Sequence, residues 1–190
     1  MSKSIYIEKN TELVEACKLG DRTAQYKLYS LYAKSMFNVC FRILNHRGEA
    51  EDVLQEAFID AFAKLGSFRQ EASFGVWLKQ IVVNKAISSL RKKKLDLVDI
   101  ENEEYRLESE SFSESISEPD ENSCDYRVEA ITKGVEMLPE GYRVVLSLYL
   151  FEGYDHEEIS SVLGISVSTS RTQYMRGKKR LYELLKTTLT

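Results

Sequence analysis

Apolar residues recur at three- and four-residue spacing along most of the first hundred positions, and this period predicts helices. The clearest helix spans about residues 49–64. Its inward positions are Ala50, Val53, Leu54, Ala57, Phe58, Ala61 and Leu65. Helices are also predicted over about 11–19, 23–44 and 73–93, and together the four form a compact N-terminal bundle. The predicted buried positions of the last two are Leu28, Leu31, Tyr32, Val39, Ile43, Phe74, Trp77, Leu78, Ile81 and Val82.

A second helical group follows residue 126. The pattern predicts helices over about 126–137, 155–163 and 167–186, with a further helix opened by Pro139 and Glu140. At the start of the 155–163 helix, Asp155 and Glu158 have capping-box spacing; after it, Gly164 suits a left-handed turn and Ser166 can cap the next helix. This combination predicts a helix-turn-helix.

The two groups are separated by the segment VDIENEEYRLESESFSESISEPDENSCD, residues 98–125. Residues 1–97 have 16 basic and 11 acidic residues, a net charge of +5. Residues 98–125 have 1 basic and 11 acidic residues, a net charge of −10, and residues 126–190 have 9 and 8, a net charge of +1. A segment so acidic and so poor in apolar residues predicts a disordered linker. Fully extended, it reaches roughly 90 Å at about 3.3 Å per residue. The sequence therefore predicts an all-α protein with two small helical domains, 1–97 and 126–190, joined by a flexible acidic linker.

Several kinds of chemistry are excluded by composition. The cysteines Cys17, Cys40 and Cys124 form no C-x-x-C pair, which favours a reducing compartment and argues against a zinc site. His46 and His156 are interpreted as surface residues, and no glycine-rich phosphate loop occurs. The N-terminal residues lack the apolar core of a signal peptide. We therefore expect a cytoplasmic protein that is not an enzyme, without metal, cofactor or small-molecule substrate.

The outward face of the last helix carries hydroxyl and basic side chains. Its candidate DNA-binding residues are Ser168, Thr169, Arg171, Thr172, Arg176, Lys178 and Lys179. Short hydroxyls near a helix start can reach base edges, while arginine and lysine suit guanine and phosphates. The alternative interpretation is a solvated polar face on a helix that only packs.

Two further surfaces belong to the first domain. Asp52, Gln55, Glu56 and Ile59 share one face, which suits a basic protein surface better than DNA because carboxylates repel phosphate; a plain solvated face is equally compatible with the spacing. The second surface combines a polar helix stripe with the preceding loop, and its residues are Phe68, Arg69, Gln80, Asn84, Ser88 and Arg91. Aromatic, amide and basic groups together are typical of single-stranded base binding, although Phe68, Phe74 and Trp77 each favour the core.

Three runs carry a resemblance to a known family: AEDVLQEAFIDAF at 50–62, SFRQEASFGVWLKQIVVNKAISSLRKK at 67–93 and LPEGYRVVLSLYLFEGYDHEEISSVLGIS at 138–166. With the intervening linker, they resemble the extracytoplasmic-function group of bacterial sigma factors. The resemblance implies a subunit that binds core RNA polymerase through the helix bearing Asp52, Gln55 and Glu56. It implies capture of a flipped base of the melted minus-ten element by the loop before Phe74 and the helix bearing Asn84.

The resemblance further implies that the helix-turn-helix recognises the duplex minus-thirty-five element of promoter DNA, and that an anti-sigma factor is a partner. The linker would thread through polymerase toward the RNA path, although a passive spacer explains its charges equally well. The chain departs from the family pattern at Ser170, where a buried valine is usual, at Gln173, where arginine is usual, and at Gly177, where alanine is usual. A stand-alone helix-turn-helix regulator and a helical interaction module without nucleic acid remain as alternatives.

Overall fold

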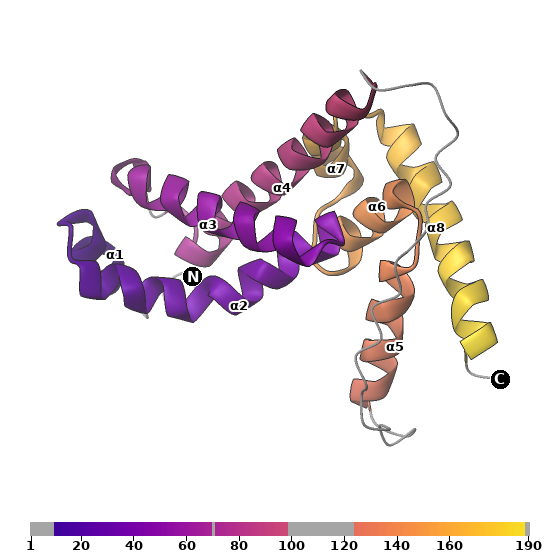
Figure 1. Ribbon diagram of the computed structural model, residues 1–190, viewed down its shortest axis with the longest axis horizontal. Coiled ribbons are helices and arrows are strands. Elements are labelled where there is room, and N and C mark those ends of the chain that lie inside the picture. The colour runs from indigo at the N-terminus through magenta and orange to yellow at the C-terminus, as the bar shows by residue number, and fades with distance from the viewer. Residues whose placement is uncertain (1–9, 70, 99–123, 189–190) are drawn as a thin grey trace, which may run out of the picture.

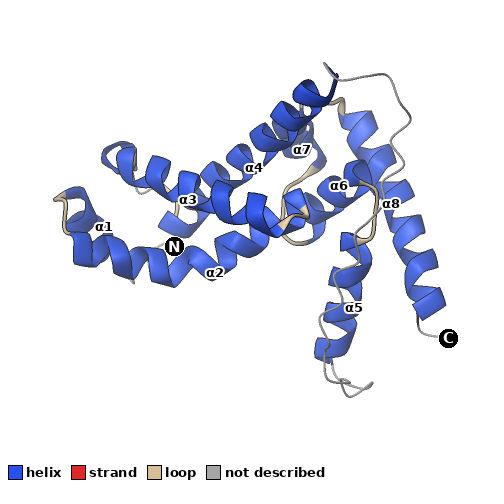
Figure 2. Ribbon diagram, in the orientation of Figure 1, coloured by secondary structure: helices blue, strands red, loops and turns tan. Residues whose placement is uncertain are grey.

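The structure is a computed structural model that describes residues 10–69, 71–98 and 124–188, which contain helices and no strand (Figures 1 and 2). The first half comprises α1 (Thr11–Lys18), α2 (Arg22–Leu44), α3 (Arg47–Ala63), the 3-10 helix η2 (Leu65–Ser67) and α4 (Phe74–Val98). The second half comprises α5 (Cys124–Glu136), α6 (Glu140–Leu150), α7 (His156–Leu163) and α8 (Val167–Thr188). The predicted all-helical fold with two helical units is confirmed.

The segment predicted as a linker is shortened at both ends by helices. Helix α4 extends to Val98, and α5 begins at Cys124, two residues before the predicted start of the second domain at residue 126. The predicted disorder of the intervening residues 99–123 lies outside the described residues. In Figure 1, α1, α2 and α3 lie on one side of the molecule and α5 and α8 on the other, while α7 lies beside the later turns of α4, where Arg91 donates to Val162 O.

The turn between α2 and α3 is set by local side-chain chemistry. Helix α2 has Asp21 as its N-cap, whose carboxylate accepts hydrogen bonds from the backbone N–H of Thr23 (2.7 Å) and of Ala24 (3.2 Å). Its C-cap is Asn45, which has a left-handed φ of 53° and donates its N–H to Phe41 O at 2.7 Å. His46 follows at once as the N-cap of α3, and its Nδ1 accepts the Glu49 N–H at 3.2 Å. The chain therefore reverses within two residues, which lets α2 and α3 pack together.

The core of the first half follows the predicted stripes with one exception. All seven predicted positions between Ala50 and Leu65 are buried. Leu31 was predicted to be buried but is 60% exposed. At 100° per residue it lies roughly 90° from the centre of the α2 stripe, which passes through Leu28, Val39 and Ile43. The short apolar period alone did not separate the edge of the stripe from its centre.

The predicted helix-turn-helix is present with its expected capping. Asp155 accepts the N–H of Glu158 (2.8 Å), and the Glu158 carboxylate accepts the N–H of Asp155 (2.9 Å), which completes the capping box. Gly164 ends α7 with a left-handed φ of 66°. Ser166 accepts the N–H of Thr169 at 3.0 Å and so caps the start of α8.

Gly177 allows α8 to approach α6 closely. A Cβ atom at this position would lie 3.0 Å from Leu146 Cδ1 and 3.0 Å from Tyr142 Cβ. The glycine costs about 1 kcal/mol of helix propensity relative to alanine. The close approach explains why it is nevertheless suited to this helix.

We expect Gly177→Val to lower the free energy of unfolding by about 1–3 kcal/mol, since the added methyls must displace α6 or its side chains. Thermal or denaturant unfolding measures the change. Gly66→Val is the matched control because a Cβ at Gly66 meets no atom within 4 Å. An unfolding midpoint of Gly177→Val at or above that of the unchanged protein would contradict the packing argument.

Helix α6 joins the two halves into one molecule. All side chains from Arg143 to Leu148 are buried. Val144, Val145 and Leu148 belong to the same apolar cluster as the core of α1 to α4, whereas Leu146 packs in a second cluster with residues of α5 and α8. The sequence predicted two domains and no particular contact between them; in the structure they share a continuous core.

Candidate polymerase and nucleic-acid interfaces

The outward face of α3 carries the four residues predicted to bind polymerase. Asp52, Gln55 and Glu56 are exposed, and Ile59 is 67% exposed. Glu56 also accepts a hydrogen bond from Lys85 of α4 at 3.0 Å. An apolar side chain surrounded by acceptors is therefore open to solvent on this face.

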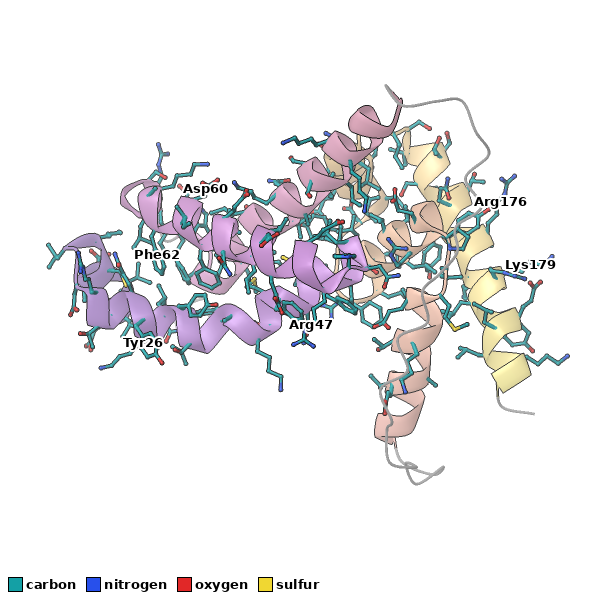
Figure 3. The ribbon with its side chains drawn as sticks, in the orientation of Figure 1. Tyr26, Arg47, Asp60, Phe62, Arg176 and Lys179 are labelled. Carbon is teal, nitrogen blue, oxygen red and sulfur yellow. The ribbon has the colours of Figure 1, made fainter. Side chains whose placement is uncertain are left out.

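Lys85 is held by two carboxylates of α3. Its ammonium lies 3.0 Å from Glu56 and 3.2 Å from Asp60, which is labelled in Figure 3. The hydrogen bond to Glu56 is the main cause that raises the pKa of Lys85, against a smaller opposing effect of burial. Glu56 thus has an ion-pair partner within the first half of the chain. Asp52 lies on the same face but takes no part in the ion pairs of Lys85.

The predicted polar stripe of α4 is exposed along its length. Gln80, Asn84, Ser88 and Arg91 all face solvent at i, i+4, i+8 and i+11 spacing. The Ser88 hydroxyl donates to Asn84 O at 2.7 Å, so it is oriented by its own helix. The Arg91 guanidinium donates to Val162 O of α7 at 2.9 Å. The stripe is continuous, but its last residue is engaged with the second half of the chain.

Among the residues predicted to contact the minus-ten element, Phe68 is the one whose side chain is buried. Its side chain is 7% exposed and packs against Phe74 and Trp77, with ring centroids 5.9 and 5.1 Å away. A ring enclosed by two others cannot present a free face to a base. Phe68 therefore belongs to the core, as its aromatic character alone favoured. Arg69 is exposed beside it, and Gln70 lies outside the described residues.

The outward face of α8 presents every residue predicted to contact duplex DNA. Exposed side chains on this face are Ser168, Thr169, Arg171, Thr172, Arg176, Lys178 and Lys179. Figure 3 shows Arg176 and Lys179 projecting from α8 into solvent. The hydroxyl of Ser166 lies 2.8 Å from those of both Ser168 and Thr169, which holds them at the start of the helix. Two kinds of donor, fixed hydroxyls and long cations, thus share one exposed face.

A hydrogen bond between the two helices of the motif was not predicted. Ser170 is fully buried and its hydroxyl lies 3.0 Å from Nδ1 of His156. The imidazole also stacks on Tyr149 (4.9 Å between centroids) and meets the edge of Tyr174 (5.6 Å). His156 is therefore half-buried, and its interpretation as a surface residue was wrong. The bond gives the polar Ser170 a partner where burial without one would be costly.

The described residues show no arrangement typical of catalysis. No group of three or more His, Cys, Asp and Glu side chains among them could hold a metal ion. Burial raises the pKa of Cys17, and it raises the pKa of Cys40 to about 12, so neither thiol is an ionised nucleophile near neutral pH. No helix in the described ranges is long and apolar enough to span a bilayer.

Comparison with known proteins defines the family. The family model for sigma-70 region 2 matches residues 28–95, and the model for sigma-70, region 4, matches residues 129–181. The chain is 31% identical over 183 residues to the RNA polymerase sigma-H factor of Pseudomonas aeruginosa, across 94% of each chain. It is 30% identical over 177 residues to the ECF RNA polymerase sigma factor SigW of Bacillus subtilis, across 91% of this chain and 95% of that one. The chain belongs to the extracytoplasmic-function group of sigma-70 factors.

As a sigma factor, the protein directs promoter-specific initiation by RNA polymerase and catalyses no reaction itself. The alternatives of a stand-alone regulator and of an interaction module without nucleic acid are therefore wrong. A solved structure with similar fold is the sigma factor RpoE in complex with the anti-sigma factor NepR from Bartonella quintana. Its TM-score is 0.54 at 24% identity, and the match covers 85% of this chain and 96% of that one.

Proposed function

We propose that the sigma factor has three separate binding surfaces. The outward face of α3 binds core polymerase. The α4 stripe with Arg69 contacts the minus-ten element, and the outward face of α8 contacts the minus-thirty-five element. The observation that carries this proposal is that all three surfaces are exposed and differ in chemistry. We also propose that the promoter-contacting units correspond to residues 1–97 and 126–190, with the intervening residues as the tether.

The chemistry of each surface supports its assignment. Asp52 and Glu56 would repel DNA phosphates, so α3 suits a basic protein surface. The amide of Asn84 can donate a hydrogen bond to the edge of an unpaired base and accept one from it, and the guanidinium of Arg69 can bind phosphates of the DNA backbone. Arg171 and Arg176 on α8 can reach guanine and phosphates in the major groove.

The partners and the cellular location follow from the same proposal. Core polymerase and the promoter are cytoplasmic in bacteria, so we place the protein in the cytoplasm. Two solved structures with a similar fold are complexes, RpoE with the anti-sigma factor NepR and CnrH with the cytosolic domain of CnrY. We propose that this chain too is bound by an anti-sigma factor.

Run-off transcription on a promoter library tests the division of work. With core polymerase, the unchanged protein should select sequences at both elements. We expect Asn84→Ala to relax the base preference within the minus-ten element, with a loss of about 1–3 kcal/mol of discrimination, and to leave the minus-thirty-five preference unchanged. The second element thus serves as an internal control. If the variant keeps the base preference at the minus-ten element, Asn84 does not contact a base there.

A further inference from the structure

Three aromatic rings meet at the junction of α6, α7 and α8, which pack against one another (Figure 1). Tyr149 of α6 stacks on His156 of α7, with 4.9 Å between the ring centroids and 26° between the ring planes. Tyr174 of α8 completes the group, with its centroid 4.5 Å from that of Tyr149 and 5.6 Å from that of His156. The imidazole of His156 therefore lies between aromatic side chains of the helix before it and of the helix after it.

His156 makes a second contact with α8, at Ser170, one turn before Tyr174. Ser170 is fully buried, and its Oγ lies 3.0 Å from His156 Nδ1. Within the described ranges the Ser170 hydroxyl has no other hydrogen-bond partner, so a hydroxyl that only accepted would leave its own proton unpaired in the core, which is costly. We therefore assign the hydroxyl as donor, Nδ1 as acceptor and the ring proton to Nε2.

The hydrogen bond fixes the rotation of α8 about its own axis, whereas the ring contacts leave some rotation free. Aromatic pairs are favourable over centroid separations of about 4.5–7 Å, so the rings tolerate a small rotation of the helix. A hydrogen bond weakens steeply once its angle departs far from linearity. Because the Ser170 hydroxyl sits on a short side chain close to the helix backbone, a rotation of α8 moves it away from His156 Nδ1.

Thr169 and Arg171, the chain neighbours of Ser170, lie on the exposed face of α8 that is proposed to contact DNA. Side-chain ends lie about 5–6 Å from a helix axis, so a rotation of about 10° displaces them by about 1 Å. Base-specific contacts require groups held within roughly 0.5 Å of the productive geometry. Contacts to phosphates, in contrast, carry no sequence information. A small rotation of α8 therefore lowers base discrimination more than it lowers overall affinity.

We propose that His156 is a positioning residue for sequence recognition. Through its hydrogen bond to Ser170 it sets the rotation of α8, and it thereby determines which bases of the minus-thirty-five element the protein prefers; this inference rests on the proposed function. The family pattern has a buried valine in place of Ser170, and valine can neither donate nor accept this hydrogen bond. The pair is therefore a specificity determinant that differs from the usual apolar contact.

Two substitutions of His156 separate the hydrogen bond from the ring contacts. His156→Phe keeps an aromatic ring against Tyr149 and Tyr174 but removes the acceptor. His156→Asn removes the ring but places an amide oxygen where Nδ1 lies, which preserves an acceptor for Ser170. In run-off transcription with core polymerase on a library of minus-thirty-five sequences, we expect His156→Phe to lower the preference for the best sequence about fivefold and His156→Asn to lower it less than about twofold. The minus-ten preference should be unchanged in both variants.

The order of the two losses decides between the hydrogen bond and the ring. An unchanged minus-thirty-five preference in His156→Phe would overturn the proposal. A loss in His156→Asn equal to or larger than that in His156→Phe would also overturn it, because the orientation of α8 would then depend on the ring.

His156→Phe combined with Ser170→Ala tests for a purely structural role of the pair. Removal of both polar groups leaves no buried hydroxyl unpaired, so the midpoint of thermal unfolding should return toward that of the unchanged protein. Because no directional contact then sets the rotation of α8, we expect the minus-thirty-five preference to stay lowered about fivefold, as in His156→Phe alone. Recovery of the preference together with the stability would mean that the hydrogen bond only stabilises the fold.

Arg171→Ala combined with Arg176→Ala, measured in the same assay, distinguishes failure of this inference from failure of the proposed function. If the arginine variant keeps the full minus-thirty-five preference, α8 does not recognise that element and the proposed function is wrong. If the arginine variant loses the preference while His156→Phe keeps it, the positioning role of His156 alone is wrong.

Discussion

Asp52→Arg combined with Glu56→Arg abolishes binding to core RNA polymerase. Both carboxylates are exposed on the α3 face around Ile59, and reversing them places cations against a surface that the proposed function requires to be basic. Like charges brought together at an interface cost several kcal/mol, so we expect a loss of at least about 3 kcal/mol, or more than roughly 100-fold in affinity. Binding of the labelled sigma factor to purified core enzyme, measured by fluorescence anisotropy, gives the value.

Two features of the structure sharpen this test. Glu56 pairs with Lys85, so the single Asp52→Arg variant separates the interface effect from loss of that ion pair. Glu12→Arg with Glu183→Arg is the matched control, because it makes the same charge change at exposed sites on α1 and α8. If the control and the α3 variant lose affinity equally, the effect is one of net charge and the α3 assignment is wrong.

Arg171→Ala combined with Arg176→Ala removes upstream promoter contacts while leaving downstream contacts in place. Each arginine that contacts a base or phosphate contributes about 1–3 kcal/mol, so the pair should cost at least about 2 kcal/mol, roughly 30-fold in affinity for the minus-thirty-five element. Footprinting of the polymerase complex should show lost protection around that element and retained protection around the minus-ten element.

Arg22→Ala with Lys133→Ala controls for the loss of two positive charges. Both residues are exposed and lie outside the proposed DNA surfaces, on α2 and α5. The control should leave both footprints intact. Equal loss of upstream and downstream protection in the Arg171 and Arg176 variant would contradict the recognition of the two elements by separate surfaces.

Local features of the fold could be predicted from the sequence because they depend on neighbouring residues. The capping box at Asp155 and Glu158 and the left-handed Gly164 are specified within a few positions, and the structure contains them as expected. The burial of Leu31 and Phe68 was harder to predict because it depends on how the whole helical bundle packs. Leu31 lies at the edge of an apolar helical stripe and is exposed, whereas Phe68 lies in a loop and is enclosed.

Contacts between distant segments could not be predicted from a single sequence. Arg42 and Glu152 are separated by 110 positions, and nothing in the local pattern links them. The run of buried residues from Val144 to Leu148 does carry a signal, since a helix that is apolar on all sides must be covered on all sides. Ser170 was noted as unusual, but its partner His156 lies 14 positions away across the turn.

The two-sided covering of α6 limits how the gene can be divided for laboratory expression. A fragment that starts at α5 would remove the α1 to α4 part of the apolar cluster that contains Val144, Val145 and Leu148, side chains that are at most 4% exposed in the intact chain. Apolar area of this kind favours self-association at about 25 cal/mol per Å² removed from water. The C-terminal half is therefore a poor candidate for isolated production, and a polypeptide that also includes α1 to α4 keeps α6 covered on both sides.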